Sequence, residues 1–339
     1  MKVTRIIIKM SNIIVSISCI TYNQATYVRD CLEGLVRQIT NFEYEILIHD
    51  DCSTDGTDLI IKEYAEKYPN LIRPIFEIEN QYSKGIPIGT AIWNLPRARG
   101  KYIAFCEGDD YWIDEYKLQK QVDILENMPN IGMCFTDFNR LHASNGKIEI
   151  SCLKNNPQKF PSNYTVESWI VRAGYVGPMT WLVRKKLWEE AEREKFRSTD
   201  GTFVIFTYFL WSSKVYCLKD TTAVYRIVRK SASHDVELAK RYKRVKDLHE
   251  LQIKLAETYL TGQEKSNASQ TINNQYYSNA LKMIVATDDK EELVNSRDYC
   301  NKSLRNKLLY VIASFGLTQR MYSVIYKGLL WVKIYLNNR

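Results

Sequence analysis

The sequence lacks the features that mark several common classes of protein. No uninterrupted run of 18 apolar residues occurs, so we expect no transmembrane helix. None of the eight cysteines lies in C-x-x-C spacing, and a chain of 339 residues does not need disulfides to build a core. We therefore expect reduced thiols in a cytoplasmic protein. Neither G-x-G-x-x-G after a first strand nor G-x-x-x-x-G-K-[ST] is present, which excludes the two common nucleotide-binding loops.

The composition is that of a globular protein with an excess of positive charge. Its 339 residues suffice for one large domain or two ordinary domains. The net charge of +8 favours an anionic partner, a class that includes nucleotide diphosphates, nucleic acid and an anionic membrane surface. The charge alone does not choose among them.

The N-terminal residues have a superficial likeness to a signal peptide. Lys9 and Asn12 interrupt the apolar run, however, and no small-residue cleavage site follows. We therefore expect residues 1–11 to be an N-terminal extension ahead of a first strand at 13–20. Met10 is an alternative start of the translated chain, because nothing before it has the pattern of a structured element.

From residue 13 to about residue 138, short apolar runs alternate with helical stripes. Strands that alternate with helices are typical of an α/β protein with a mainly parallel sheet and right-handed crossovers. We predict strands at 13–20, 44–49, 71–78, 101–106 and 131–138, and helices at 27–36, 58–67, 91–99 and 117–127.

The second half of the chain has a less regular pattern. Residues 139–163 have the composition of irregular structure, and from Val236 the pattern is helical to the end of the chain. Between these two parts we predict helices at 166–173, 187–195 and 203–211, and strands at 180–184, 215–218 and 223–228.

The most informative stretch follows the fourth predicted strand, which stops abruptly at three carboxylates. Glu107, Asp109 and Asp110 lie within four residues, and such crowding raises the pKa of each carboxyl group unless a cation relieves it. Mg²⁺ takes oxygen ligands and is usually held by one or two carboxylates together with the phosphates of a substrate. Because parallel sheets bind ligands at the carboxyl ends of their strands, the stretch predicts a metal–diphosphate site. A solvated acidic turn is the alternative.

A second pair of carboxylates, Asp50 and Asp51, follows the second predicted strand. The residues from Asp51 to Gly56 are similar to the start of a calcium loop, but its twelfth position would be Lys62, where that loop requires a glutamate. The pair therefore either caps the strand end or accepts an N–H from a pyrimidine base. Since both carboxylate groups follow strands, we expect them to converge on one crevice.

Four motifs in order along the chain resemble family 2 glycosyltransferases. The resemblance is strong over residues 12–140 and weak over 175–234, and the segment 117–123 also looks like that family. The motifs are Thr21-Tyr22-Asn23, His49-Asp50-Asp51-Cys52-Ser53-Thr54-Asp55-Gly56-Thr57, Ala98-Arg99-Gly100-Lys101-Tyr102-Ile103 and Glu107-Gly108-Asp109-Asp110-Tyr111-Trp112.

The resemblance implies the GT-A fold, the fold of nucleotide-diphospho-sugar transferases. It places a catalytic domain at residues 12–234, with a nucleotide-sugar half at 12–112 and an acceptor half at 113–234. A C-terminal helical region at 235–339 would follow. The motifs are specific for the fold and for nucleotide-sugar binding, but not for the sugar.

The resemblance also assigns residues to the nucleotide. Tyr22 would lie against the base, and Asp51 would accept a hydrogen bond from the edge of the base. Asp50 would support that loop or reach the ribose, and Thr21 and Asn23 complete this part of the site.

The metal site implied by the resemblance is the acidic stretch after the fourth strand. Glu107 and Asp109 take the places of the family's D-x-D pair, with glutamate in the first place, and Asp110 follows them. Together they would hold Mg²⁺ or Mn²⁺ on the donor diphosphate, and Asp109 would also contact the nucleotide sugar. The ion would act as a Lewis acid that neutralises charge on the departing nucleoside diphosphate.

The family's general base corresponds to Asp200. A positioned base of this kind commonly contributes ~10²–10⁴-fold to the rate. The alternative is that Asp200 is the N-cap of the apolar helix that follows it, a role that aspartate favours. The two roles are compatible.

Three further residues are candidates for diphosphate or acceptor contacts. Arg226 lies in a segment that resembles the family's segment near the diphosphate, but many members have a histidine where this chain has Val228. His234 is a candidate replacement, and a solvated basic loop is the alternative. Trp181 either lines the acceptor site or is buried in the core.

The segment 303–339 combines basic side chains with apolar and aromatic ones and contains no acidic residue. A basic amphipathic segment of this kind can lie in a membrane interface, which here would be the inner face of the cell membrane. The alternative is that these helices cap the catalytic domain.

Taken together, these motifs predict an inverting glycosyltransferase. It would transfer one sugar from a nucleotide-diphosphate sugar, expected to be UDP-linked, to a glycan or lipid-linked acceptor in bacterial surface polysaccharide synthesis. A nucleotidyltransferase acting on sugar phosphates is the alternative enzyme. A nucleic-acid-binding protein is the alternative of another class, but the basic residues concentrate near the C-terminus instead of forming a stripe with aromatics.

Overall fold

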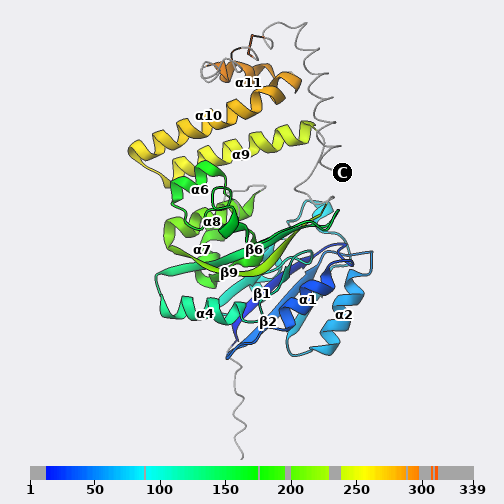
Figure 1. The fold of residues 1–339 in the computed structure, drawn as a ribbon. Coiled ribbons are helices and arrows are strands. Elements are labelled where there is room, and N and C mark those ends of the chain that lie inside the picture. The colour runs from blue at the N-terminus through cyan, green and yellow to red at the C-terminus, as the bar shows by residue number, and fades with distance from the viewer. Residues whose placement is uncertain are drawn as a thin grey trace, which may run out of the picture. The chain divides into compact units, whose positions relative to one another are not determined.

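The computed structural model describes residues 13–87, 89–174, 176–194, 200–228, 238–287 and 289–297, together with residues 307, 310 and 311 (Figure 1). The described residues form two compact units that alternate along the chain. The first unit contains residues 13–164, 176–194 and 208–228, and the second contains 165–174, 200–207 and the described residues from 238 onward. The extension at 1–11, His234 and nearly all of the segment 303–339 lie outside the described residues.

The first unit is built on one sheet, and the predicted α/β fold is confirmed. Among the described residues the strand order is β3-β2-β1-β4-β8-β6-β9-β5, with β7 paired to β6. Strands β3, β2, β1 and β4 are parallel, as are β6 and β9. The bounds are β1 (Ile13–Thr21), β2 (Glu43–Asp50), β3 (Ile72–Phe76), β4 (Tyr102–Phe105), β5 (Tyr111–Trp112), β6 (Ile131–His142), β7 (Ile148–Glu149), β8 (Leu182–Arg184) and β9 (Lys214–Ile227).

The antiparallel pairs are what make the sheet mixed. Strand β8 is antiparallel to both of its neighbours, β4 and β6, and the short β5 is antiparallel to β9. The pairing of β5 with β9 brings the chain that follows the acidic stretch next to residues more than a hundred positions later. The carboxyl ends of β1, β2 and β4 meet at the same edge of the sheet, because these neighbouring strands are parallel.

The helices of the first unit connect these strands. Helix α1 buries the apolar stripe expected for it, and its Gly34 allows a close approach to β5: a Cβ there would lie 2.7 Å from the carbonyl oxygen of Trp112. The elements are α1 (Val28–Val36), α2 (Thr57–Lys67), α3 (Thr90–Trp93), α4 (Lys117–Asn127), α5 (Cys152–Asn155) and α7 (Lys185–Glu194), with 3₁₀ turns η1 (Tyr82–Lys84), η2 (Leu95–Arg97) and η3 (Pro178–Thr180). Helix α8 (Gly201–Ser212) begins in the second unit and ends in the first.

The structure differs from the predicted elements at several places, among them three in the first unit. The helix expected at 91–99 is only α3 followed by η2, because Pro96 lacks an N–H and cannot continue an α-helix. The two strands expected at 215–218 and 223–228 are one strand, β9, whose pairing with β6 shifts register around Asp137. The stretch 139–163 is not irregular throughout, since it contains the end of β6, all of β7 and α5.

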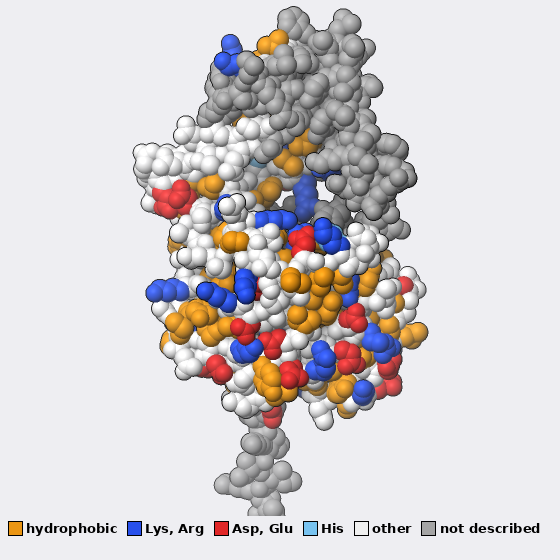
Figure 2. Space-filling view, in the orientation of Figure 1, with side chains coloured by type: hydrophobic (Ala, Val, Ile, Leu, Met, Phe, Trp, Pro, Cys, Tyr) orange, Lys and Arg blue, Asp and Glu red, His pale blue; other side chains and the backbone are white. Residues whose placement is uncertain are grey.

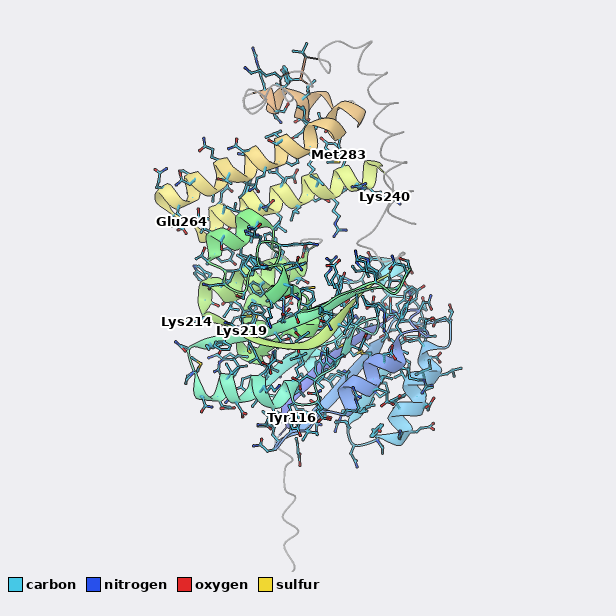
Figure 3. The ribbon with its side chains drawn as sticks, viewed as in Figure 1. Tyr116, Lys214, Lys219, Lys240, Glu264 and Met283 are labelled. Atoms are coloured by element: carbon cyan, nitrogen blue, oxygen red, sulfur yellow. The ribbon has the colours of Figure 1, made fainter. Side chains whose placement is uncertain are left out.

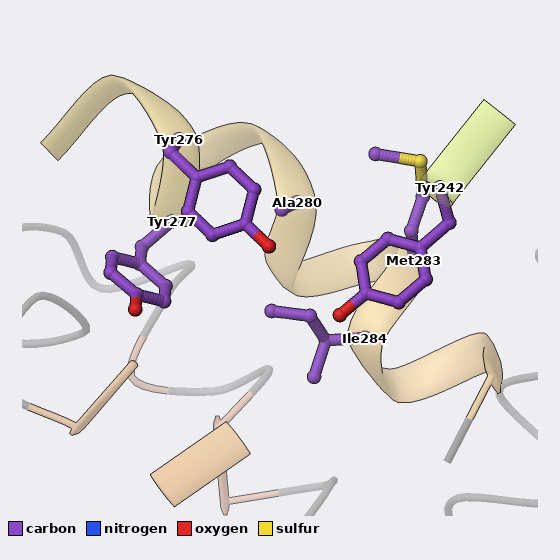
Figure 4. Close-up of a cluster of buried hydrophobic side chains, with 6 residues drawn as sticks. All are labelled: Tyr242, Tyr276, Tyr277, Ala280, Met283 and Ile284. Carbon is purple, nitrogen blue, oxygen red and sulfur yellow. The ribbon is translucent and has the colours of Figure 1, made fainter. Parts of the chain in front are cut away.

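The second unit is helical. It contains α6 (Val166–Arg172), α9 (Leu238–Tyr259), α10 (Gly262–Thr287) and α11 (Lys290–Asn295). Side chains of α9 and α10 share a buried cluster (Figure 4), made of Tyr242, Tyr276, Tyr277, Ala280, Met283 and Ile284.

Two contacts outside this cluster hold the helices of the second unit together. The buried ring of Trp169 on α6 stacks on Phe206 with 4.0 Å between ring centroids. Gln252 of α9 donates its side-chain N–H to the carbonyl of Ile170, at 2.6 Å. Within the part of the chain that the structure describes, no helix is both long and apolar enough to cross a membrane.

A buried carboxylate, Glu45, joins β1, β2 and the start of β4. It accepts hydrogen bonds from the hydroxyl of Ser16 at 2.7 Å, the backbone N–H of Arg99 at 2.9 Å and the Arg99 guanidinium at 2.6 Å. The Ser16 hydroxyl accepts in turn from the N–H of Gly100 at 2.8 Å. Burial opposes ionisation of Glu45, but the hydrogen bonds from Arg99 and Ser16 outweigh it and lower the pKa. The charged carboxylate therefore stabilises the strand edge.

We predict that Glu45→Gln lowers the free energy of unfolding at pH 7 by about 2–3 kcal/mol, because the bonds to Arg99 lose their charge. A lowered folded-state pKa stabilises the protein above the unfolded-state pKa of about 4.3, and this stabilisation is lost as the pH falls through the folded-state value. The difference between the variant and the wild type should therefore shrink below about pH 4. Urea unfolding at several pH values measures it. The control is Glu63→Gln, which removes a surface ion pair with Arg29; equal effects of the two variants would contradict the prediction.

Candidate active site

The residues predicted to bind the nucleotide sugar lie at adjoining strand ends in the first unit. Thr21 at the end of β1 is paired in register with Asp50 at the end of β2. The N–H of Asp51 donates to the carbonyl of Thr21 at 3.0 Å, and the N–H of Gly108 donates to the carbonyl of Ile20 at 3.1 Å. Backbone hydrogen bonds therefore join the ends of β1, β2 and β4, and the two carboxylate groups follow neighbouring strands at one edge of the sheet.

Asp50 is a strand-end cap. Its Oδ1 accepts from the hydroxyls of Thr21 at 2.8 Å and Ser53 at 2.6 Å, and its Oδ2 accepts from the N–H of Ser53 at 3.0 Å. The side chain is 1% exposed. Of the two roles expected for Asp50, this geometry is that of loop support.

Tyr22 is presented to solvent by a fixed turn. The following residue, Asn23, has φ of 51°, a left-handed conformation that asparagine tolerates better than most residues. Its side-chain oxygen accepts the N–H of Thr54 at 2.8 Å, and its own N–H donates to Ser53 Oγ at 2.9 Å. The Tyr22 ring is 44% exposed, so it is available to a ligand.

Asp51 is fully buried and already hydrogen-bonded. Its Oδ1 accepts the N–H of Gln81 at 2.7 Å, and its Oδ2 accepts the N–H of Tyr82 at 3.2 Å. With 0% exposure, the carboxylate does not meet a base edge in this arrangement. The role implied for Asp51 stays a prediction that requires these two amides to move.

The acidic stretch after β4 is a turn with three different carboxylates. Glu107 is solvent-exposed, Asp109 is half-buried and Asp110 is 4% exposed. Although its tip is open to solvent, the protein packed around Glu107, together with the charge of Asp109, raises its pKa to about 7. Burial likewise raises the pKa of Asp109, with partial relief from Arg226, and burial followed by the charge of Asp109 raises that of Asp110.

Arg226, near the end of β9, holds this turn in place. Its backbone N–H donates to Asp110 Oδ1 at 2.8 Å, and its guanidinium donates to the carbonyl of Asp109 at 2.8 Å and to Asp30 Oδ2 at 2.7 Å. The guanidinium also lies between two tyrosine rings, 4.7 Å from the centroid of Tyr27 and 4.8 Å from that of Tyr111. Because Arg226 is 6% exposed and fully engaged, its role in this geometry is to clamp the turn.

The turn fits a divalent cation that completes its coordination with substrate oxygens. Among the described residues, no three His, Cys, Asp or Glu side chains are placed to hold a metal by themselves. Burial raises the pKa of both Glu107 and Asp109, and the charge of Asp109 raises that of Glu107 further, so a cation beside them would favour their charged forms. Asp110 is turned toward Arg226, so the fit rests on Glu107 and Asp109.

Gly108 is the residue that lets the turn lie against β1. A Cβ at this position would be 2.4 Å from the side-chain oxygen of Gln24 and 2.6 Å from Cγ2 of Thr21. That oxygen of Gln24 is buried and has no hydrogen-bond partner among the described residues. The spacing of Glu107 and Asp109 therefore depends on a glycine between them.

The remaining predicted residues are placed as follows. Trp181 is 1% exposed and packs edge-on against Phe105, which corresponds to the core alternative and not to an acceptor contact. Asp200 precedes α8, and its Oδ1 accepts the N–H of Phe203 at 3.0 Å, as an N-cap does. The base role of Asp200 is neither supported nor opposed by this bond.

Lys117 is a residue near the turn that sequence reasoning did not single out. It is 0% exposed, its Nζ donates to Oε1 of Gln121 at 2.7 Å, and it lies 4.2 Å from the ring centroid of Trp112. Burial lowers its pKa to about 7. The signal for it was available in the sequence: Lys117 falls on the buried stripe of α4 with Leu118, Gln121 and Leu125.

An open cavity of about 530 Å³ lies elsewhere in the first unit and contains none of the predicted site residues. Tyr116, which belongs to it, is at the edge of the unit in Figure 3. The lining residues are Arg37, Ile113, Asp114, Glu115, Tyr116, Lys120, Asp220 and Thr221. On the face of the first unit visible in Figure 2, basic and acidic side chains are intermingled, without the basic stripe of a nucleic-acid-binding surface.

Comparison with known proteins finds relatives by sequence. The family model described as Glycosyl transferase family 2 matches residues 16–190. An uncharacterised protein of Mycobacterium tuberculosis is 47% identical over 121 residues, 35% of this chain and 34% of that protein, so the chain spans about a third of its length. The putative teichuronic acid biosynthesis glycosyltransferase TuaG of Bacillus subtilis is 25% identical over 244 residues, 70% of this chain and 90% of that protein.

Solved structures are similar in fold. Staphylococcus aureus TarS 1–349 in complex with UDP-GlcNAc has a TM-score of 0.60 at 17% identity, covering 96% of this chain and 92% of that one. The mannosyltransferase PcManGT of Pyrobaculum calidifontis, in complex with GDP-Man and Mn²⁺, has a TM-score of 0.52 at 16% identity, covering 96% and 88%.

We predict that Gly108→Ala abolishes Mn²⁺-dependent binding of UDP while the protein stays folded, because the added methyl group pushes the turn away from Thr21 and Gln24. Calorimetric titration with UDP and Mn²⁺, with circular dichroism as the folding check, measures this. The matched control is Gly89→Ala, at φ −66° with nothing within 4 Å of the added Cβ. Normal binding by the Gly108 variant would show that the turn tolerates displacement.

Proposed function

The chain belongs to glycosyltransferase family 2 and has the GT-A fold expected from its sequence, and from this premise we propose that it is an inverting enzyme that transfers one sugar from a nucleotide-diphosphate sugar, UDP-linked, to a glycan or lipid-linked acceptor. The observation that carries the proposal is the convergence of Tyr22, Asp50 and the turn containing Glu107 and Asp109 at adjoining strand ends. The family itself disfavours the nucleotidyltransferase and nucleic-acid alternatives.

The donor would be held by residues of the first unit. The exposed ring of Tyr22 is available to stack on the base, and Asn23 and Asp50 keep the surrounding loop in shape. Glu107 and Asp109 would hold Mg²⁺ or Mn²⁺ against the diphosphate. When bound, the ion would neutralise charge on the departing nucleoside diphosphate. Arg226 and Asp110 keep the two carboxylates at the required place.

The acceptor is proposed from chemistry and from the names of relatives. Asp200 would accept the proton of the attacking hydroxyl as general base. TuaG is named for teichuronic acid biosynthesis, which supports a surface polysaccharide of a bacterium as the acceptor class. Attachment to the inner face of the membrane through 303–339, in an otherwise cytoplasmic protein, belongs to the same proposal.

A thermal-shift panel of nucleotide sugars with and without Mn²⁺ tests the donor proposal, since a ligand that binds only the folded state raises the melting temperature. We expect a UDP-sugar to raise it only when Mn²⁺ is present. Asp109→Ala should lose this shift and lose at least about 100-fold in transfer rate, because several kcal/mol of transition-state stabilisation come through the ion. The control Asp123→Ala removes an exposed carboxylate on α4. A fully active Asp109 variant would refute the metal assignment.

Asp200→Asn separates the two roles of Asp200, because asparagine caps a helix as well as aspartate but cannot take a proton. We expect an unchanged melting temperature, unchanged UDP affinity and a loss of ~10²–10⁴-fold in transfer rate. Steady-state kinetics with the identified donor measure this. Retained turnover would leave Asp200 with its capping role alone.

A further inference from the structure

The carboxylate of Asp51 is closed off by the segment 80–87. The N–H groups of Gln81 and Tyr82 donate to its two oxygens, and the side chain of Asn80 donates to its backbone carbonyl at 3.1 Å. A carboxylate only accepts hydrogen bonds, so a ligand that replaces these amides must itself bring a donor, either an N–H or an O–H. The side chain of Asp51 is 0% exposed.

The segment 80–87 is wound on itself and tethered at its two ends. Its own bonds are local: the N–H of Lys84 and that of Ile86 both donate to the carbonyl of Gln81, at 3.0 and 3.1 Å. One tether is Asp51. A second is the indole N–H of Trp93, which donates to the carbonyl of Pro87 at 3.2 Å. The side chain of Gln81 also donates to Glu77 at 3.2 Å, and Lys84 forms an ion pair with Glu79. A compact segment with few outside contacts can move as a unit at low cost in free energy.

The segment and the residues just before it expose apolar side chains for which the first unit provides no cover. Ile78 is 90% exposed, Tyr82 63% and Ile86 39%. Single exposed apolar residues are ordinary, but three within nine positions beside a ligand site point to a surface that a ligand completes. The backbone N–H of Tyr82 donates to the carboxylate of Asp51, so a change in this hydrogen bond would also move the ring of Tyr82.

We propose that the segment 80–87 is a base-selecting strap of the donor site. An N–H of the incoming nucleobase replaces the amides of Gln81 and Tyr82 on Asp51, the strap is released, and Tyr82 moves against the base opposite Tyr22. The strap therefore selects bases that present an N–H to Asp51, as uracil does with its N3–H, over ligands without such a donor. This inference rests on the proposed nucleotide-sugar function.

Hydrogen exchange of the amides of Gln81 and Tyr82 tests the strap, with ligand affinity measured separately by calorimetry in Mn²⁺. UDP should speed their exchange at least tenfold. The matched probes are 5-methyl-UDP, which keeps the N3–H of the base, and 3-methyl-UDP, which replaces it with a methyl group. The first should act as UDP does, and the second should bind at least tenfold more weakly and leave the exchange slow.

Two variants make the test independent of the probes. Asp51→Asn has one acceptor oxygen in place of two, so at least one of the two amides should exchange fast without nucleotide. The control is Asp58→Asn, at a half-buried carboxylate of α2 that is paired with Lys62. Tyr82→Ala keeps both backbone amides and should weaken UDP about tenfold with slow exchange in the free protein, which keeps the test decisive if the Asp51 variant does not fold.

The outcomes separate this inference from the function on which it rests. If UDP binds while the two amides stay protected, or if 3-methyl-UDP binds as well as 5-methyl-UDP, the strap is refuted and the donor proposal stands. If no nucleotide diphosphate or nucleotide sugar binds in the presence of Mn²⁺, the donor proposal is refuted and the strap with it.

Discussion

Repulsion among the carboxylates of the turn after β4 is the constraint on which the first unit depends. Glu107 and Asp109 stand one glycine apart; burial raises the pKa of both, and the charge of Asp109 raises that of Glu107 further. A turn of this kind does not keep its shape by itself. Arg226 holds it from β9 with a buried guanidinium and a backbone N–H, while Gly108 lets it lie against β1. The pairing of β5 with β9 is what brings the two parts of the chain together.

The carboxylates at the strand ends divide into two kinds. Asp50, Asp51 and Asp110 are buried, and each accepts hydrogen bonds from backbone N–H groups. They shape the site from within. Glu107 and Asp109 are more exposed, and carboxylate oxygens of this kind are the ligands that a divalent cation on a diphosphate takes. In such a site the buried carboxylates hold the surrounding backbone rigidly, and the metal ion takes its remaining ligands from the substrate.

The segment 80–87 is the part of the site whose conformation can change. It is fixed by hydrogen bonds to Asp51 and Trp93 and by side-chain contacts to Glu77 and Glu79. Thr21, Asp50 and Gly108 are instead fixed by the ends of three paired strands. The difference in contact explains why one part can be rearranged by a ligand and the other cannot. If the strap acts as we propose, the same carboxylate keeps the empty site closed and selects the base that opens it.

The sequence by itself determined the parallel half of the sheet, the order of its helices, the family and the position of both carboxylate groups at strand ends, because period-two and helical patterns and strand-end motifs are local properties. It did not determine which acidic residues are free, since that depends on partners far away in the chain, such as Arg226 for Asp110 and the amide of Gln81 for Asp51. Lysine is usually found at the surface, but Lys117 is buried against the ring of Trp112. The two short strands expected after residue 214 are one strand, because their pairing with β6 continues through shifts of register. Burial and long-range pairing are decided only when the sheet closes, and so only the tertiary structure decided them.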